Sequence, residues 1–126
     1  MTHPGAEAYI DSLADLYAEE WELDFLKIDC VFGQDWFRGE AFVRRLIEAL
    51  QKRRRPVVIS LSPGSPKPNA KLAAAARDMA TSLKQPMMAR LTGDFWDAWD
   101  QLKAHFAYAA ELELYSTTLF SPDLVR

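Results

Sequence analysis

The sequence of 126 residues is poor in residues that bind metals or form disulfides: it contains one cysteine, Cys30, and two histidines. A single cysteine excludes an internal disulfide and a cluster of thiolate ligands. We interpret Cys30 as a small buried apolar side chain, as free cysteines commonly are. His105 has no second ligand at metal-binding spacing and is interpreted as a solvated or helix-packing histidine. We therefore expect no metal and no other cofactor.

The sequence also lacks long apolar runs and a strong net charge. No stretch approaches the roughly 20 apolar residues of a membrane span, so no membrane association is predicted. The segment Met1–Gly5 leads directly into an amphipathic pattern without a secretory signal, which leaves the compartment unknown. The net charge is −3 and the one dense basic run, Lys52–Arg55, is expected to close a helix rather than to bind phosphate. No nucleic-acid partner is predicted.

What the sequence does contain is the composition of one globular α/β domain, with 49% hydrophobic and 26% charged residues. Strands alternate with helices, which predicts βα units and a parallel sheet. The chain is interpreted as a single domain over 1–126 with an irregular tail at 113–126. The predicted helices cover 6–21, 35–53, 70–84 and a segment that begins at 95, and the predicted strands cover 23–29, 56–61 and 86–91.

Each predicted helix carries apolar residues at the three-and-four spacing that buries one side of a helix. We expect Trp96 and Trp99 to be core residues for this reason rather than a platform for sugars. The predicted buried positions are Tyr9, Leu13, Leu16, Tyr17 and Trp21 in the first helix, Val43, Leu46, Ile47 and Leu50 in the second, Leu72, Ala76, Met79 and Leu83 in the third, and Phe95, Trp99, Leu102, Phe106 and Ala110 in the fourth.

The strand 23–29 carries charge where a buried strand should be apolar. Because side chains alternate across a strand, Phe25, Lys27 and Asp29 share one face. Ligand chemistry in parallel sheets lies at the carboxyl ends of the strands. The polar residues predicted to gather there are Lys27, Asp29, Ser60, Ser62, Arg90, Thr92 and Asp94.

Two carboxylates at the ends of different strands are typical of glycoside hydrolysis, in which one attacks the anomeric carbon and the other protonates the leaving oxygen. Asp29 stands beside the cation of Lys27, which should keep its carboxyl ionised and suited to attack. Asp94 follows a glycine at a strand-to-helix turn, where a dry pocket would suit it to act as the general acid.

Three other interpretations remain open at the level of the residues. Asp94 is also placed to cap the fourth helix. Lys27 and Asp29 can form a structural ion pair. Lys27 can be the amine of a Schiff-base enzyme, since such lysines also lie on barrel strands.

Three segments, 24–30, 55–64 and 90–99, in this order and spacing, resemble the middle of an α-galactosidase (melibiase) catalytic domain of glycoside hydrolase family 27. Their sequences are DFLKIDC, RPVVISLSPG and RLTGDFWDAW. The resemblance covers residues 6 to about 112. It implies strands 4–6 of a (β/α)8 TIM barrel and a retaining O-glycosyl hydrolase that acts on terminal α-linked galactose or a related sugar.

Carried over by position, the resemblance implies that Asp29 is the nucleophile and Asp94 the acid/base. Lys27 and Arg90 match residues that contact the sugar. Ser62 stands where α-galactosidases carry a glutamate that binds the substrate, and Val31 replaces a family cysteine. An acetamido sugar or a β-L-arabinopyranoside is therefore an alternative substrate, because one such contact decides between closely related sugars. Family members are often secreted.

The length of the chain also departs from the family, because a (β/α)8 barrel needs about 250 residues. We therefore expect a partial catalytic domain that is inactive by itself and that self-associates into a homo-oligomer. The alternative hypothesis is a non-catalytic α/β remnant, or a self-associating module without hydrolase activity.

Overall fold

The computed structural model describes residues 3–29, 36–62, 70–90, 92 and 96–108. It confirms the predicted alternation of helices and parallel strands; the predicted tail at 113–126 lies outside these residues. No helix in the described ranges has the length and apolar character needed to cross a bilayer. The elements are α1 (Ala6–Asp15), the π-helical turn η1 (Leu16–Glu20), β1 (Phe25–Asp29), α2 (Trp36–Leu50), β2 (Val58–Ser62), α3 (Ala70–Leu83), β3 (Met87–Ala89) and an unlabelled helix at 99–108.

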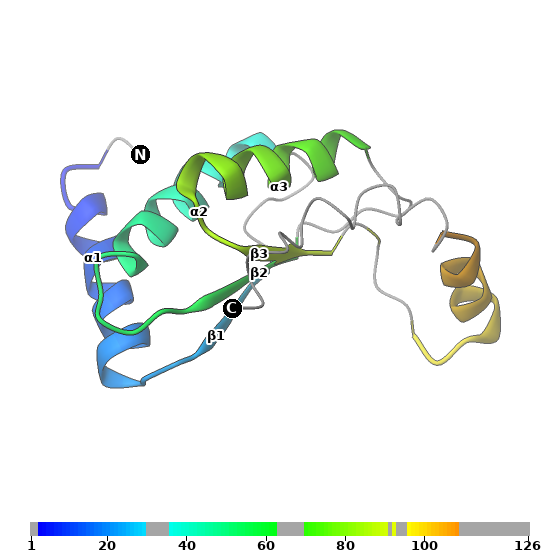
Figure 1. Cartoon of the computed structure of the whole chain (residues 1–126), viewed down its shortest axis with the longest axis horizontal. Coiled ribbons are helices and arrows are strands. Elements are labelled where there is room, and N and C mark those ends of the chain that lie inside the picture. The colour runs from blue at the N-terminus through cyan, green and yellow to red at the C-terminus, as the bar shows by residue number, and fades with distance from the viewer. Residues whose placement is uncertain (1–2, 30–35, 63–69, 91, 93–95, 109–126) are drawn as a thin grey trace.

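The three strands form one parallel sheet in the order β1-β2-β3 (Figure 1). Leu26 pairs with Ile59, which pairs with Met87, and all three side chains belong to the same face. The opposite face carries the alternate residues of each strand, beginning with the pair Phe25 and Val58. The register therefore separates an apolar face from a mixed face.

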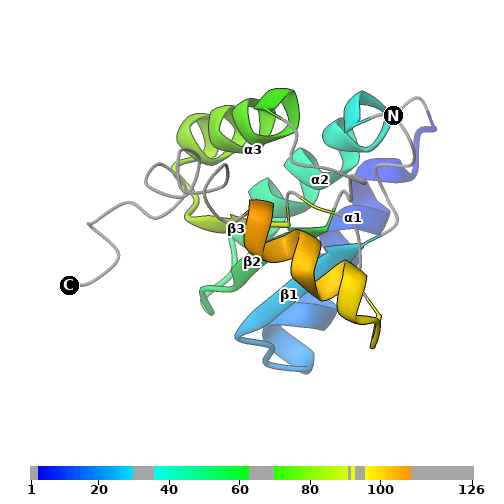
Figure 2. The same cartoon turned by 90° about the vertical axis from the view of Figure 1, so that its right-hand side faces the viewer.

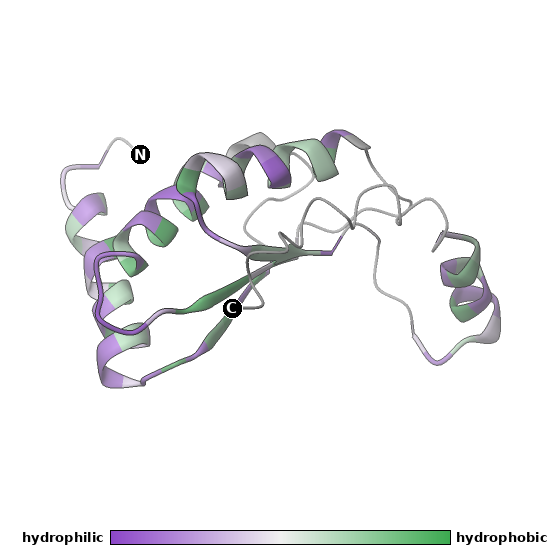
Figure 3. Ribbon diagram, viewed as in Figure 1, coloured by the Kyte–Doolittle hydropathy of each residue, from purple (hydrophilic) through white to green (hydrophobic). Residues whose placement is uncertain are grey.

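The apolar face is covered by α2 and α3, which lie along one side of the sheet (Figure 1). Apolar residues concentrate along β1 and β2, whereas the connection from α2 to β2 is hydrophilic (Figure 3). The predicted buried positions of α2 and α3 are confirmed, with Leu83 partly buried at the end of α3. Buried in the core are Ile28, Val43, Leu46, Ile47, Leu50, Ile59, Leu61, Leu72, Ala76, Met79 and Met87.

The predicted buried side of the first helix is wrong in part. Ile10, Ala14 and Ala18 are buried, whereas Tyr9 and Trp21 are exposed. The small alanine side chains allow the first helix to pack against α2, and the predicted Leu13 and Tyr17 are partly buried beside them, whereas the rings of Tyr9 and Trp21 stay at the surface. The sequence prediction assigned burial to the large apolar side chains, but the fully buried positions of this helix include the small alanines because they allow close packing.

The turn η1 was not predicted and changes how the chain enters β1. The backbone N–H of Trp21 donates to the carbonyl of Leu16 (2.8 Å), which is the five-residue spacing of a π-helix. Glu22 follows with φ of 52°, in the left-handed region that non-glycine residues seldom adopt. The π turn and Glu22 together end the helix and direct the chain into the sheet.

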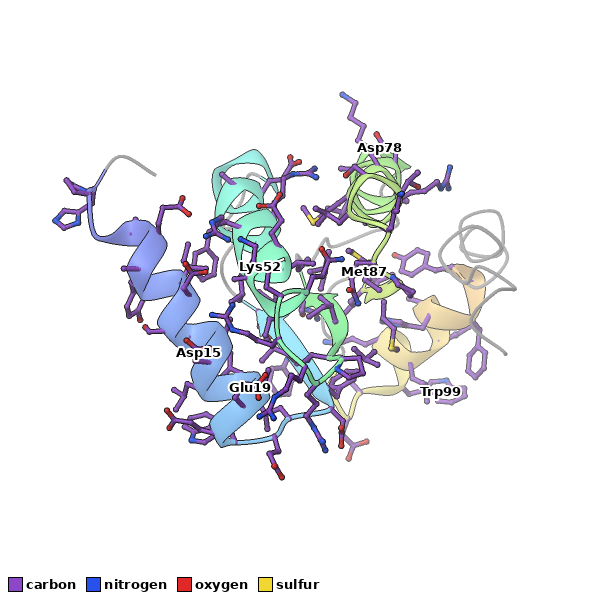
Figure 4. All side chains as sticks on the ribbon, turned by 60° about the vertical axis from the view of Figure 1, so that its left-hand side comes forward. Asp15, Glu19, Lys52, Asp78, Met87 and Trp99 are labelled. Carbon is purple, nitrogen blue, oxygen red and sulfur yellow. The ribbon has the colours of Figure 1, made fainter. Side chains whose placement is uncertain are left out.

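Helix α2 ends at Leu50, three residues before the predicted end. The following arginines pair with carboxylates: Arg53 with Asp15 (2.7 Å), Arg54 with Glu19 (2.8 Å) and Arg55 with Asp24 (2.9 Å). Asp15 and Glu19 lie on the α1–η1 helix beside this connection (Figure 4). The basic run therefore joins the start of the chain to the end of α2, and Arg53 also donates to the carbonyl of Ala49 (3.2 Å).

The helix at 99–108 corrects a second prediction. Trp96, Trp99 and Phe106 were expected in the core but are exposed. The helix stands beyond the carboxyl ends of the strands, apart from α2 and α3 (Figures 1 and 2), and Trp99 lies on it (Figure 4). Its apolar spacing was recognised correctly, but no described element packs on that side of the helix.

Candidate functional site at the carboxyl ends of the strands

Polar residues at the ends of β1 and β2 and just after β3 lie at one end of the sheet. Asp29, the last residue of β1, is the register partner of Ser62, the last residue of β2. The backbone N–H of Arg90 donates to the carbonyl of Leu61 (2.9 Å), which continues the parallel ladder just past β3. The structure thus brings the segments of Asp29, Ser62 and Arg90 side by side, although 61 positions separate the first from the last.

Lys27 and Asp29 form an ion pair on the mixed face, with 3.3 Å between Nζ and Oδ2. Both side chains are about half exposed, so water screens the pair and its contribution to stability is small. Ser60 is the register partner of Lys27 on β2. An ammonium and a carboxylate therefore stand next to each other on an accessible surface.

Ser62 differs from these neighbours because it is only 3% exposed. Within the described part of the chain, its Oγ is buried and has no hydrogen-bond partner. A buried hydroxyl left in this state costs about 1–3 kcal/mol. Ser62 therefore offers a hydrogen-bonding group at the end of β2, directly beside the strand that carries Asp29.

Asp94 lies outside the described residues, as do Cys30 and Val31, so its predicted roles as acid/base or helix cap stay predictions. Thr92, two residues earlier, is buried, and its Oγ1 lies 3.4 Å from Nε2 of His105. Nδ1 of His105 lies 2.9 Å from the carbonyl of Gln101 and donates to it, so Nε2 accepts from the threonine hydroxyl.

This threonine–histidine contact was missed by sequence reasoning. Thr92 was recognised as a polar residue near the strand ends, but no pattern links it to a histidine 13 positions later. The imidazole also packs edge-on against Tyr108, with 6.0 Å between the ring centroids. His105 therefore matches the helix-packing alternative, and it connects helix 99–108 to the segment that leaves β3.

A cavity of about 380 Å³ lies at the opposite end of the sheet, where β2 begins. Its lining includes Gln51, Arg53, Val57 and Gln85, which belong to the connections that lead into β2 and β3. This cavity is separate from the polar residues at the carboxyl ends of the strands. The candidate site is therefore the strand end and not this cavity.

Comparison with known proteins places the chain among glycoside hydrolases. The sequence model of the family described as alpha galactosidase A matches residues 1–118. No curated protein matches the sequence significantly. Among solved structures, a GH27 β-L-arabinopyranosidase from Geobacillus stearothermophilus, a TIM-barrel enzyme, is similar, with 32% identity and a TM-score of 0.65. The match covers 89% of this chain and 24% of the arabinopyranosidase, so this chain spans about a quarter of that protein's length.

Proposed function

Because this chain belongs to the alpha galactosidase A family of glycoside hydrolase family 27, we propose that it carries the two catalytic carboxylates of a retaining glycosidase. The proposed nucleophile is Asp29 and the proposed acid/base is Asp94. The whole of residues 1–126 is proposed to form part of one catalytic barrel domain. Its substrate is proposed to be a carbohydrate with a terminal α-linked galactose or a sugar of related ring configuration.

The main support for the nucleophile is the position of Asp29. It ends a parallel strand, where ligand chemistry in such sheets takes place. The neighbouring ammonium of Lys27 favours the charged carboxylate that attack requires. In the first step, Asp29 would displace the leaving oxygen at the anomeric carbon and form a glycosyl ester, which water then hydrolyses with retention.

Support for Asp94 as acid/base is its place in the chain, five residues after the last residue of β3. In a retaining enzyme the two carboxyl groups stand about 5–5.5 Å apart, with one above and one below the anomeric carbon. Asp94 would give its proton to the leaving oxygen and then take a proton from the attacking water.

Ser62, Arg90 and Lys27 are the proposed contacts to sugar hydroxyls. The register pairing of Ser62 with Asp29 supports this assignment, because it places Ser62 directly beside the proposed nucleophile. The solved neighbour is named for β-L-arabinopyranose, whose ring matches α-galactose without the exocyclic CH2OH group. Ser62→Glu should therefore move the kcat/KM values for the two sugars in opposite directions. The ratio of the two values should then change by a larger factor than either value does.

The two other interpretations of Lys27, as a Schiff-base amine and as a member of a structural ion pair, receive less support. A Schiff-base lysine is activated by desolvation or by a neighbouring cation, whereas Lys27 is half exposed and stands beside a carboxylate. An ion pair contributes much to stability only when it is buried, whereas Lys27 and Asp29 are both about half exposed. Borohydride reduction in the presence of a carbonyl substrate should therefore leave Lys27 unmodified.

The decisive experiment inserts residues 6–112 of this chain into the Geobacillus enzyme in place of its matching quarter. The chimera is assayed with aryl α-galactosides and aryl β-L-arabinopyranosides. Asp29→Asn should lower kcat by about 10³-fold or more, as loss of a nucleophile does, whereas Asp78→Asn on the outer surface of α3 should not change it. A chimera that hydrolyses either substrate and keeps its rate with Asp29→Asn would contradict the nucleophile assignment.

The acid/base assignment has a separate test in the same chimera. Asp94→Asn should slow glycosides with poor leaving groups strongly and dinitrophenyl glycosides much less, because a good leaving group needs no proton. Added azide should restore turnover by attacking the glycosyl ester in place of activated water. Equal losses on both substrate classes, without rescue by azide, would contradict the role of Asp94.

A non-catalytic module that self-associates is the second candidate, and one observation favours it. Phe25, Val58 and Met88 leave apolar surface exposed on the mixed face of the sheet. A homo-oligomer would cover this surface without any hydrolase activity. Light scattering of the purified chain over a range of concentrations, together with an assay for both glycosides, distinguishes this candidate from the first.

A further inference from the structure

Two side chains of the last described helix contact the chain on both sides of Asp94. On one side, Oγ1 of the buried Thr92 lies 3.4 Å from Nε2 of His105. On the other side, the backbone N–H of Trp96 donates to Oε1 of Gln101 (2.7 Å). We call Thr92 and Trp96 the anchors, because each is tied to the same helix.

The two side chains that bind the anchors are also linked to each other. Nδ1 of His105 donates to the carbonyl of Gln101 (2.9 Å), so Nε2 keeps a lone pair for the hydroxyl of Thr92. Gln101 lies in the first turn of the helix, where its N–H and that of Leu102 donate to the carbonyl of Ala98 (3.1 Å each). Residues four apart lie on the same side of a helix, so Gln101 and His105 form one unit.

Covalent geometry makes these contacts a restriction on the residue between the anchors. Asp94 is two positions from Thr92 and two from Trp96. Two fully extended residues span about 7 Å, so the backbone at Asp94 lies within that distance of each anchor. A segment fixed at one end only would have a much larger range of positions.

We propose that Gln101 and His105 are positioning residues for the acid/base of the glycosidase. They fix the backbone before and after Asp94, so that its carboxyl group stays within hydrogen-bond reach of the glycosidic oxygen. General acid catalysis requires this distance, and a misplacement of about 1 Å can lower a rate by about 100-fold. This inference rests on the proposed acid/base role of Asp94.

The contact of Gln101 is suited to positioning more than to stabilising the fold. Trp96 is 75% exposed, and its hydrogen bond to Gln101 is accessible to solvent. Loss of such a bond costs little stability, because water replaces the missing partner. Its main effect is therefore on where the segment lies, and proton transfer from Asp94 depends on that position.

The dependence on the leaving group measures the role in catalysis. In the chimera, Gln101→Met removes the acceptor and nearly keeps the shape, whereas Gln101→Glu keeps an acceptor for the anchor N–H. Gln101→Met should lower kcat/KM about tenfold to 100-fold for glycosides with poor leaving groups, and about twofold or less for dinitrophenyl glycosides. Gln101→Glu should keep most of the parent rate. Thr92→Val and Thr92→Ser form the matching pair at the other anchor.

A double-mutant cycle shows whether the effect passes through the carboxyl group. In an Asp94→Asn background, Gln101→Met should cause no further loss of kcat/KM, because the group that it positions is absent. Lys103→Ala, exposed on the same helix, should change neither background. The same loss with and without Asp94 would overturn the inference.

The single variants separate the failure of this inference from the failure of the proposed function. A large loss with Asp94→Asn and none with Gln101→Met would overturn the positioning role alone. Unchanged rates with Asp94→Asn would overturn the acid/base role, and the positioning role with it.

Amide hydrogen exchange in the full chain of 126 residues tests the contact without any catalysis. Gln101→Met should speed exchange of the Trp96 N–H about threefold or more, while exchange of Ile59 in β2 stays unchanged. Gln101→Glu should exchange like the parent chain. Equal exchange at Trp96 in the parent and in Gln101→Met would overturn the inference, whether or not the chimera is active.

Discussion

Arg54 binds Glu19 with both its backbone and its side chain. Its N–H donates to Oε1 of Glu19 (2.8 Å), and its guanidinium donates to Oε2 (2.8 Å). These contacts lower the pKa of Glu19 below its usual 4.5. The largest cause is the backbone hydrogen bond from Arg54, and the next is the hydrogen bond from its guanidinium. The same contact raises the pKa of Arg54. The π turn η1 and the connection before β2 are therefore joined by an interaction that depends on pH.

We predict that this contact weakens in acid. Because the folded-state pKa of Glu19 is depressed, its stabilising effect is complete above the unfolded pKa of about 4.5 and is lost as the pH falls through the lower folded value. Glu19→Gln should lower the urea midpoint at pH 7 and reduce its decline between pH 5 and pH 3. Glu20→Gln, at the next position and exposed, is the control; a decline unchanged by Glu19→Gln would contradict the prediction.

The contact between α1 and α2 should not tolerate a larger residue at Ala14. This side chain is fully buried, so Ala14→Leu should destabilise the fold by about 1–3 kcal/mol through overpacking. Tyr9→Ala removes a much larger side chain but from an exposed position, and should change stability by about 0.5 kcal/mol or less. Thermal unfolding of the two variants tests the order, and the reverse order would show that α1 packs through its aromatic side.

Lys84, the residue that follows α3, has a φ of 50°, a conformation that glycine adopts without the steric cost of a side chain. We expect Lys84→Gly to stabilise the protein by up to about 1 kcal/mol. Ala74→Gly, inside the same helix, should destabilise it by about the same amount. Denaturant unfolding measures both, and a loss of stability with Lys84→Gly would contradict the role assigned to its backbone.

The contact between Thr92 and His105 should hold helix 99–108 to the segment after β3. Thr92→Val keeps the shape of the side chain but removes the hydroxyl, and His105→Ala removes the imidazole. Each should speed amide hydrogen exchange in the helix while exchange in β2 stays unchanged. Lys103→Ala, exposed on the same helix, is the control. If the effects of the two variants simply add in a double-mutant cycle, the side chains are not coupled.

Much of the fold was predictable because local patterns report burial directly. The apolar spacing of α2 and α3 identified Val43, Ile47, Ala76 and Met79 as core residues. The alternation around Ile59 separated the two faces of β2. In these elements the apolar side chains recur at a regular spacing and face a single packing surface, so the spacing in the sequence identifies the buried residues.

The first and last described helices show where this correspondence ends. Tyr9 and Trp99 stand at helical spacing and are apolar, yet both are exposed. Spacing shows that a helix has an apolar side, but which side is buried depends on the element that packs against it. For α1 that element is α2, which selects alanines; for the last helix no described element takes this place.

The sequence by itself determined the type and order of the elements and which residues carry charge at the strand ends. Only the tertiary structure decided that Asp29 and Ser62, 33 positions apart, become register partners, and that Arg90 joins them through a backbone bond to Leu61. It also decided that Ser62 is buried while Asp29 stays half exposed. The physical reason is that periodicity acts within one strand, whereas register and burial depend on hydrogen bonds and contacts between segments that lie far apart along the chain.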